Sequence, residues 1–126
     1  MASILIIDDD EQARSFIREA LKRAGHDVAE ASDGDDGTRR ARELRPALVI
    51  TDILMPNKEG LEVIRELREH DRTLPIIAMS GGSQRMAPHD VLQVASYLGA
   101  RKVLLKPFAM NELLSAVDTV LALPRA

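Results

Sequence analysis

Polar residues that can do chemistry follow directly after four apolar runs in this sequence. Each run has the short length and the aliphatic content of a strand that is buried in a sheet. The polar residues, in chain order, are the carboxylates Asp8 and Asp9, a third carboxylate Asp52, the hydroxyl of Ser80 and the amine of Lys106. Ligands bind at the carboxyl ends of strands in open α/β sheets. If the runs are neighbouring parallel strands, all these side chains lie at one binding edge.

Three carboxylates that converge at one edge would repel one another and could not all stay ionised. A hard divalent ion relieves this repulsion, and Mg²⁺ takes oxygen ligands while it keeps several waters. We expect Asp9 and Asp52 to bind the ion directly. Asp8 is expected to act through a water, and the backbone carbonyl of Leu54 to add another oxygen. The alternative is that the acidic run caps the next helix, but one aspartate is enough for a cap, and we assign that role to Asp10.

Lys106 is the one lysine that stands in an apolar stretch of the sequence. A buried amine is costly unless it is paired, and at this strand end its partner would be Asp52. The alternative is a lysine at the sheet margin that extends its amine to water. A cis peptide bond to Pro107 would be one way to aim the ammonium inward. Beside this pocket, Ser80 offers a hydroxyl, and Gly81 lets the backbone approach a tetrahedral anion.

Together these groups predict a site for phosphoryl transfer. Asp52 is the nucleophile, and Mg²⁺ neutralises charge on the transferring group. Lys106 and the Ser80 hydroxyl hold the remaining oxygens, with help from the backbone amides of Leu54 and Gly81. Positioning and electrostatics supply nearly all of the catalysis in such chemistry.

The periodicity of the chain predicts five β-α units in strict alternation. The strands are expected near residues 4–7, 27–31, 47–51, 74–79 and 103–105, and the helices near 13–24, 34–45, 61–67, 91–98 and 111–122. Right-handed crossovers then require a parallel sheet with helices on both faces. The more polar second strand favours an edge position, which agrees with the strand order 2-1-3-4-5. The predicted fold class is an α/β doubly wound sheet of five parallel strands and five helices.

The composition bounds the class of protein. A chain of 126 residues, 45% hydrophobic and 29% charged, fits one globular domain, and the absence of cysteine excludes disulfides and thiolate metal sites. Net charge is −3 and no basic block stands out, which argues against nucleic acid as the main partner. No apolar run approaches the ~20 residues of a membrane span, and no signal-peptide pattern is present. We therefore expect a cytoplasmic protein that has no membrane contact.

The ordered set of motifs resembles the receiver domains of two-component response regulators over essentially the whole chain. The matching pieces are ILIIDDD at 4–10, TDILMP at 51–56, MSG at 79–81, GA at 99–100 and KPF at 106–108. The resemblance implies that Asp52 accepts a phosphoryl group from a phosphohistidine on a sensor histidine kinase or a histidine phosphotransfer protein. It implies that Asp8 and Asp9 are the acidic pair, Ser80 the hydroxyl switch residue and Lys106 the family's lysine.

The same resemblance implies a flavodoxin-like receiver domain over 1–126 without an output domain. Such a domain signals to a downstream protein through its surface or passes its phosphoryl group along a relay. It is a signalling phosphoacceptor rather than an enzyme. In receivers, the positions that influence hydrolysis are here Leu54 and Gly82, neither of which can orient a water through its side chain. We therefore expect slow loss of the phosphoryl group.

Two departures from the family pattern concern signalling. The position three residues before the lysine usually carries an aromatic switch residue, and here it is Val103. The stretch from Ser80 to Lys106 is longer than is typical, with the excess in residues 81–88. We hypothesise that this loop replaces the aromatic side chain as the moving part.

Two other functions compete with the receiver interpretation. The acidic run contains the Asp-x-Asp spacing of haloacid-dehalogenase-type phosphatases, in which Asp8 would be the nucleophile and Asp10 the acid/base. That interpretation leaves Asp52 without a role. A module that binds a partner without being phosphorylated is the other alternative, but it gives no reason to keep a costly cluster of charges.

Overall fold

Five parallel strands form one sheet in the computed structural model, which describes residues 2–53, 60–81, 93, 96 and 99–124. The strands are β1 (Ser3–Ile7), β2 (Asp27–Ala31), β3 (Leu48–Asp52), β4 (Ile76–Ser80) and β5 (Lys102–Leu105). Their order is β2-β1-β3-β4-β5, and every neighbouring pair is parallel. The predicted strand order and fold class are therefore confirmed.

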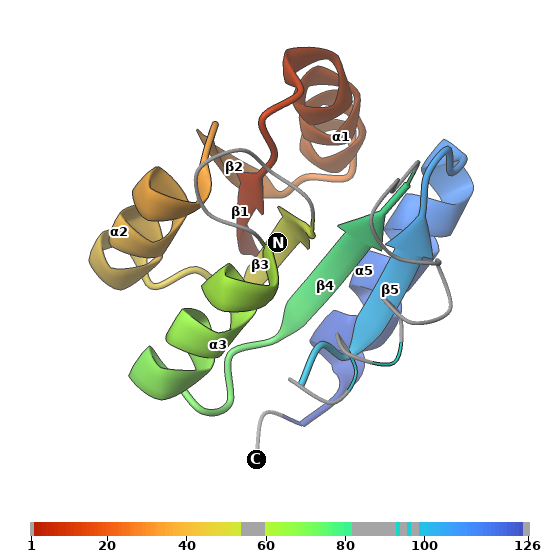
Figure 1. Cartoon of the computed structure of the whole chain (residues 1–126). Coiled ribbons are helices and arrows are strands. Elements are labelled where there is room, and N and C mark those ends of the chain that lie inside the picture. Colours follow the sequence, from red (N-terminus) through yellow and green to blue (C-terminus); the bar gives the residue numbers. More distant parts are fainter. Residues whose placement is uncertain (1, 54–59, 82–92, 94–95, 97–98, 125–126) are drawn as a thin grey trace.

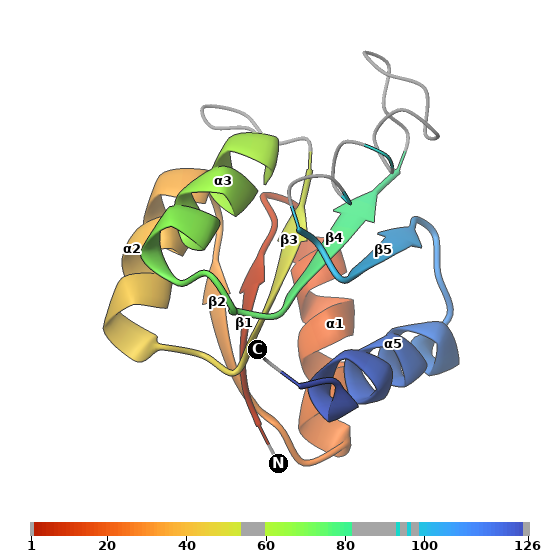
Figure 2. The same cartoon turned by 90° about the horizontal axis from the view of Figure 1, so that it is seen from below.

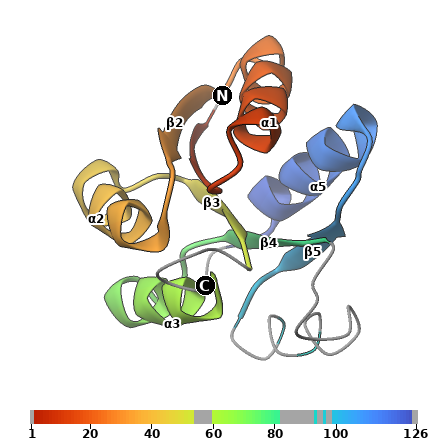
Figure 3. The same ribbon diagram turned by 45° about the horizontal axis from the view of Figure 1, so that its top comes forward.

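Helices cover both faces of this sheet, as Figures 1 to 3 show. They are α1 (Glu11–Arg23), α2 (Gly34–Leu44), α3 (Gly60–His70) and α5 (Met110–Ala122). The helices α1 and α5 lie together on one face, and α2 and α3 lie on the other. The helix expected near 91–98 falls mostly outside the described residues, and the two described residues in that range, Gln93 and Ser96, are helical. None of the described helices is both long and apolar enough to cross a bilayer.

The alternation of side chains along the strands builds two apolar layers. On β1, Leu5 and Ile7 join the layer beneath α2 and α3, which also contains Val63 and Leu67. The intervening residues Ile4 and Ile6 join the layer beneath α1 and α5. Because both faces are covered, β3 and β4 are buried along their whole length, whereas β2 at the edge is only half-buried.

Local signals in the sequence begin and end the helices. The Asp10 carboxylate caps α1 by accepting a hydrogen bond from the Gln12 amide at 2.9 Å, as predicted. Asp33 caps α2 in the same way by accepting from the Asp36 amide at 2.8 Å. After α1, Gly25 adopts a φ of 93°, a left-handed conformation that glycine reaches without steric cost.

The start of α3 lies directly against the end of β3. The Gly60 amide donates a hydrogen bond to the Ile53 carbonyl at 2.6 Å, so the helix begins one short connection after the strand that carries Asp52. A Cβ atom on Gly60 would overlap the Asp52 carbonyl oxygen. Only a residue without a side chain therefore allows this close approach.

We predict that Gly60→Ala destabilises the fold by about 2 kcal/mol, because the new methyl group must displace backbone rather than a flexible side chain. The measurement is urea unfolding followed by circular dichroism. Glu62→Ala, an exposed change in the first turn of the same helix, should stay within about 0.5 kcal/mol of the parent. A Gly60→Ala variant as stable as Glu62→Ala would contradict the prediction.

Candidate functional site

The candidate site lies at the edge of the sheet where the strands end (Figure 2). Asp8 follows the last residue of β1, Asp52 and Ser80 are the last residues of β3 and β4, and Lys106 follows β5. In the register of the sheet, Asp52 is opposite Met79, so Ser80 lies one position beyond Asp52. The fold thus brings these residues to one edge, although they are dispersed over most of the chain.

An ion pair shared by three strands forms the centre of this edge. The Lys106 ammonium lies 2.9 Å from an Asp8 carboxylate oxygen and 3.2 Å from an Asp52 carboxylate oxygen. The sequence predicted Asp52 as the partner of this lysine, and the structure adds Asp8 at a shorter distance. Asp8 is fully buried and Asp52 is 8% exposed. Because water cannot solvate them freely, both carboxylates depend on this ammonium for charge compensation.

Two opposing effects set the pKa of Lys106. Burial by itself lowers the pKa, since the charged form loses hydration. The hydrogen bond to Asp8 and the negative charges of Asp52 and Asp8 raise it by more, so the pKa lies above the ordinary lysine value. The ammonium is therefore charged at neutral pH. The peptide bond between Lys106 and Pro107 is cis.

The charges at the edge do not balance. One carboxylate oxygen from each of Asp8, Asp9 and Asp52 can be chosen so that all three lie within 4.8 Å of one another. Lys106 supplies one positive charge against three negative ones. Three hard oxygen donors with a residual negative charge are the kind of set that Mg²⁺ takes. The residues present therefore fit a divalent ion.

Asp8 and Asp9 differ in their freedom at this site. The Asp8 carboxylate accepts the Asp10 amide at 2.9 Å on one oxygen and the Lys106 ammonium at 2.9 Å on the other. Asp9 is exposed to solvent. Asp8 is thus held by protein groups on both oxygens, whereas Asp9 is open to solvent, from which an ion could reach it.

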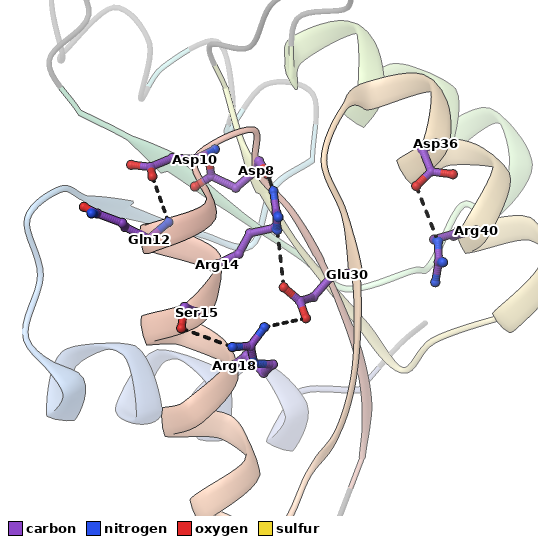
Figure 4. A network of polar contacts seen from close by, with 9 residues as sticks. All are labelled: Asp8, Asp10, Gln12, Arg14, Ser15, Arg18, Glu30, Asp36 and Arg40. Carbon is purple, nitrogen blue, oxygen red and sulfur yellow. Dashed lines mark hydrogen bonds and ion pairs between the residues drawn. The ribbon is translucent and has the colours of Figure 1, made fainter.

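The backbone of Asp8 is held by a network that the sequence analysis missed (Figure 4). The Arg14 guanidinium donates to the Asp8 carbonyl at 2.7 Å and to the Glu30 carboxylate at 3.3 Å. Glu30 also accepts from Arg18 at 2.9 Å, and Arg18 donates to the Ser15 hydroxyl at 3.1 Å. The available signal was the spacing of Arg14 and Arg18, which four residues apart share one face of a helix.

Ser80 and Gly81 lie against Lys106. Ser80 is 3% exposed, and its carbonyl accepts the Lys106 amide at 2.7 Å. A Cβ atom on Gly81 would overlap the Cβ of Lys106. The sequence attributed this glycine to the approach of an anion. The structure gives a steric reason instead: a side chain at position 81 would overlap the aliphatic part of Lys106, so only glycine fits there.

Several predicted features fall outside the described residues. They are the Leu54 carbonyl and amide, the Gly82 position and the stretch 82–88 that was expected to move on signalling. Val103 is described: it is half-buried on β5 and packs against the apolar layer beneath α2 and α3. It offers a small aliphatic side chain where the family usually has an aromatic one.

Comparison with known proteins gives the family. The sequence profile described as "Response regulator receiver domain" matches residues 4–118, which is most of the chain. The chain belongs to this family. It is therefore a receiver domain, the phosphoacceptor of two-component systems, and the resemblance drawn from its motifs is confirmed.

Relatives of this receiver domain are response regulators. It is 31% identical over 118 residues to the alkaline phosphatase synthesis transcriptional regulatory protein PhoP of Bacillus subtilis, an alignment that covers 94% of this chain and 48% of PhoP. It is 36% identical over 121 residues to the response regulator MprA of Mycobacterium leprae, which covers 94% of this chain and 50% of MprA. The chain thus spans about half the length of the curated relatives it matches.

Solved structures share the fold of this receiver domain. The chemotaxis response regulator CheY4 of Vibrio cholerae superposes with a TM-score of 0.85 at 29% identity, over 95% of this chain and 98% of CheY4. A receiver domain protein from Clostridium thermocellum reaches a TM-score of 0.88 at 28% identity, over 96% and 94% of the two chains. Both comparisons extend over nearly the whole of each chain.

Lys106→Gln is expected to lower the free energy of unfolding by about 2 kcal/mol in EDTA, because two shielded carboxylates lose their shared cation. The loss is smaller than for a fully buried pair, since the lysine side chain keeps 24% of its exposure. Mg²⁺ should reduce the difference in the free energy of unfolding between Lys106→Gln and the parent, because it restores positive charge to the folded state. The measurement is urea unfolding with and without Mg²⁺.

The matched control is Lys102→Gln, which removes an exposed lysine from β5, the strand that Lys106 follows. It should leave stability within about 0.5 kcal/mol of the parent in both buffers. Equal stability of the two variants in EDTA would contradict the prediction.

Glu30→Gln is expected to destabilise the receiver domain in a pH-dependent way. Burial raises the pKa of Glu30, but hydrogen bonds and charges from Arg18 and Arg14 lower it by more, so the net shift is downward. A lowered pKa means stability that is present above the ordinary glutamate value and lost as pH falls through the folded-state value. The carboxylate keeps 28% exposure, so water screens the pairs and we expect about 1 kcal/mol at pH 7.

The measurement is urea unfolding of the parent and Glu30→Gln from pH 7 down to pH 3.5. The difference between their free energies of unfolding should become smaller below about pH 4.5. Glu69→Gln, an exposed change on α3, should stay within about 0.5 kcal/mol of the parent throughout. A difference that is constant across this range would show that Glu30 acts through packing rather than charge.

Proposed function

We propose that the receiver domain takes a phosphoryl group on Asp52, with Mg²⁺ bound beside it, from a sensor histidine kinase or a histidine phosphotransfer protein. The observation that carries the proposal is the Lys106 ammonium, which lies 3.2 Å from Asp52 and 2.9 Å from Asp8. A cation tethered to a neighbouring carboxylate stays in place while Asp52 reacts. The carboxylate, the ammonium and the acidic pair together supply the nucleophile and the charge compensation that phosphoryl transfer needs.

Asp52 is the nucleophile in this reaction. One of its carboxylate oxygens forms a bond to phosphorus as the phosphorus–nitrogen bond of the phosphohistidine breaks. The imidazole leaves with the electron pair and takes a proton from solvent. The position of Asp52 at the end of a fully buried strand supports this role, because a rigid strand fixes the carboxylate for in-line attack.

The acidic residues would hold the metal ion. Bound Mg²⁺ would supply positive charge to the oxygens of the transferring group. Asp9 and Asp52 are proposed as direct ligands, with the Leu54 carbonyl as a further oxygen. Asp8 is proposed to act through a bound water. Its two carboxylate oxygens already accept hydrogen bonds from the Asp10 amide and the Lys106 ammonium, which supports an indirect role.

The remaining oxygens of the phosphoryl group would bind Lys106, the Ser80 hydroxyl and the backbone amides of Leu54 and Gly81. Phosphorylation replaces the single negative charge of Asp52 with a group that carries more charge. Lys106 can turn from Asp52 to a phosphoryl oxygen while it keeps its hydrogen bond to Asp8. The buried Ser80 lies beside this lysine, which supports a hydroxyl contact to the same group.

The proposed role is signalling rather than turnover. The domain assists its own phosphorylation and loses the phosphoryl group slowly in a cytoplasmic setting. The phosphorylated surface then contacts a downstream protein or passes the group on along a relay. The name of PhoP describes a transcriptional regulator, and a response of that kind through a partner or a further part of the protein is compatible with this role.

The phosphatase alternative is less well supported by the geometry. It requires Asp8 as a free nucleophile, but this carboxylate is fully buried and accepts hydrogen bonds on both oxygens. It also requires Asp10 as acid/base, but that side chain caps α1. Asp52, which the phosphatase interpretation leaves unused, has the Lys106 ammonium beside it.

We predict that incubation with acetyl phosphate and Mg²⁺ adds one phosphoryl group to the intact protein, about 80 Da by mass spectrometry, as expected for a single acyl phosphate. EDTA should abolish the addition, because the acidic cluster then lacks the ion that balances its charge. Asp52→Asn should also abolish it.

Two outcomes would overturn this proposal. Addition that persists in Asp52→Asn and disappears in Asp8→Asn would restore the phosphatase alternative. No addition to the parent, in a protein that NMR shows to be folded and to bind Mg²⁺, would favour the module that works without phosphorylation.

A further inference from the structure

The Arg14 side chain connects Asp8, at the edge of the sheet that carries the acidic cluster, to β2, the outer strand. It rises from the first turns of α1 and keeps only 15% of its side-chain exposure. One end of its guanidinium donates to the Asp8 carbonyl at 2.7 Å, and the Nε atom donates to Glu30 at 3.3 Å. Figure 4 shows the guanidinium between these two groups. A single planar group thus bridges β2 and the loop that follows β1.

Glu30 fixes the direction of this bridge. Its second oxygen accepts from Arg18 at 2.9 Å, so two arginines of α1 hold one carboxylate of β2. Strand β2 is in turn paired with β1 along its whole length. Arg14 is therefore held on its far side and cannot turn toward the carboxylates of the metal site without breaking its bond to Glu30.

The contact falls on the peptide unit that joins the two acidic residues. The Asp8 carbonyl that accepts from Arg14 belongs to the Asp8–Asp9 peptide. On its other side, the Asp8 amide donates to the Ala31 carbonyl at 3.1 Å. Rotation of the Asp8–Asp9 peptide would swing the exposed Asp9 carboxylate while leaving the buried Asp8 side chain in place. The orientation of Asp9 thus depends on what fixes this carbonyl, together with the Asp10 amide, which donates to the Asp8 carboxylate on the other side of Asp9.

We propose that Arg14, anchored by Glu30, is a positioning residue for the Mg²⁺ ligand Asp9. By holding the Asp8 carbonyl it sets the plane of the Asp8–Asp9 peptide and presents the Asp9 carboxylate toward Asp52. This inference rests on the proposed metal site. Groups that orient metal ligands commonly change metal affinity by about 10–100-fold when they are removed.

Whether removal of Arg14 weakens or strengthens Mg²⁺ binding distinguishes positioning from simple electrostatics. A guanidinium beside a cation site repels the incoming ion, so its removal by charge alone should strengthen Mg²⁺ binding. Loss of positioning should weaken it, because Asp9 must then be ordered by the ion itself. The two explanations therefore predict opposite changes in the dissociation constant.

The test is a Mg²⁺ titration of the whole chain followed by NMR amide shifts, with calorimetry as a second measure of affinity. For Arg14→Gln we expect the dissociation constant to rise roughly threefold to tenfold, less than for direct removal of a hydrogen bond to a ligand atom. Arg14→Lys should also raise it, because one ammonium cannot donate to the Asp8 carbonyl and to Glu30 in the fork geometry of arginine. An unchanged or lowered constant in either variant would overturn the proposal.

The matched control is Arg18→Gln, which removes the other arginine from the same glutamate without touching Asp8. It should leave the Mg²⁺ dissociation constant within about twofold of the parent, since the Arg14 contact remains. An equal rise in Arg18→Gln and Arg14→Gln would overturn the proposal by assigning the effect to the ion-pair network as a whole. Arg14→Lys keeps the positive charge and serves as the test if Arg14→Gln does not fold.

The rate of phosphorylation by acetyl phosphate supplies an independent readout. In Arg14→Gln the Mg²⁺ concentration for half-maximal rate should rise, while the rate at saturating Mg²⁺ should return to about the parent value. A lower rate at saturating Mg²⁺ with an unchanged half-maximal concentration would overturn the proposal. If the parent itself bound no Mg²⁺, the proposed function would fail instead, so the two failures are distinguishable.

Discussion

The ammonium of Lys106 and the two carboxylates that share it hold the functional edge together. Asp8, Asp52 and Lys106 lie at the ends of β1, β3 and β5, and the bond to Asp8 joins residues that are 98 positions apart. Opposite charges that are largely shielded from water are stable only when they meet. The packing of the sheet therefore has to align the ends of these three strands with one another. A slip in register between two strands would leave a carboxylate without its cation.

Two glycines and the contacts of Arg14 with Asp8 and Glu30 help to hold the charged residues in place. Gly60 lets α3 begin against the end of β3, and Gly81 lets the stem of Lys106 pass. On the other side, Arg14 and Glu30 fix the backbone of Asp8 from α1 and β2. Backbone and salt bridges thus surround the charged site, and of its three clustered carboxylates Asp9 is the exposed one. This division would suit the proposed site, which must stay rigid and still admit an ion and a phosphodonor.

Val103 raises a separate question about how such a site communicates. In the proposed reaction, a phosphoryl group would bind Lys106 and Ser80, which lie at the ends of β5 and β4. In most receivers an aromatic side chain on the last strand reports this change, whereas here a valine packs into the apolar layer beneath α2 and α3. A small aliphatic group offers little rotamer change. The hypothesis that residues 81–88 move in place of an aromatic side chain stays a prediction.

The sequence by itself determined the strands, their order and the residues at the binding edge. Apolar runs of this length that are rich in β-branched residues favour buried strands. Their strict alternation with helices, together with the more polar second strand, favours the order 2-1-3-4-5. Only the tertiary structure decided that Lys106 pairs with Asp8 as well as Asp52, and that Arg14 holds the Asp8 carbonyl against Glu30. Periodicity gives the face on which a residue lies. The rotation of a helix against its sheet, and the register between distant strands, set which atoms meet, and these depend on the packing of the whole core.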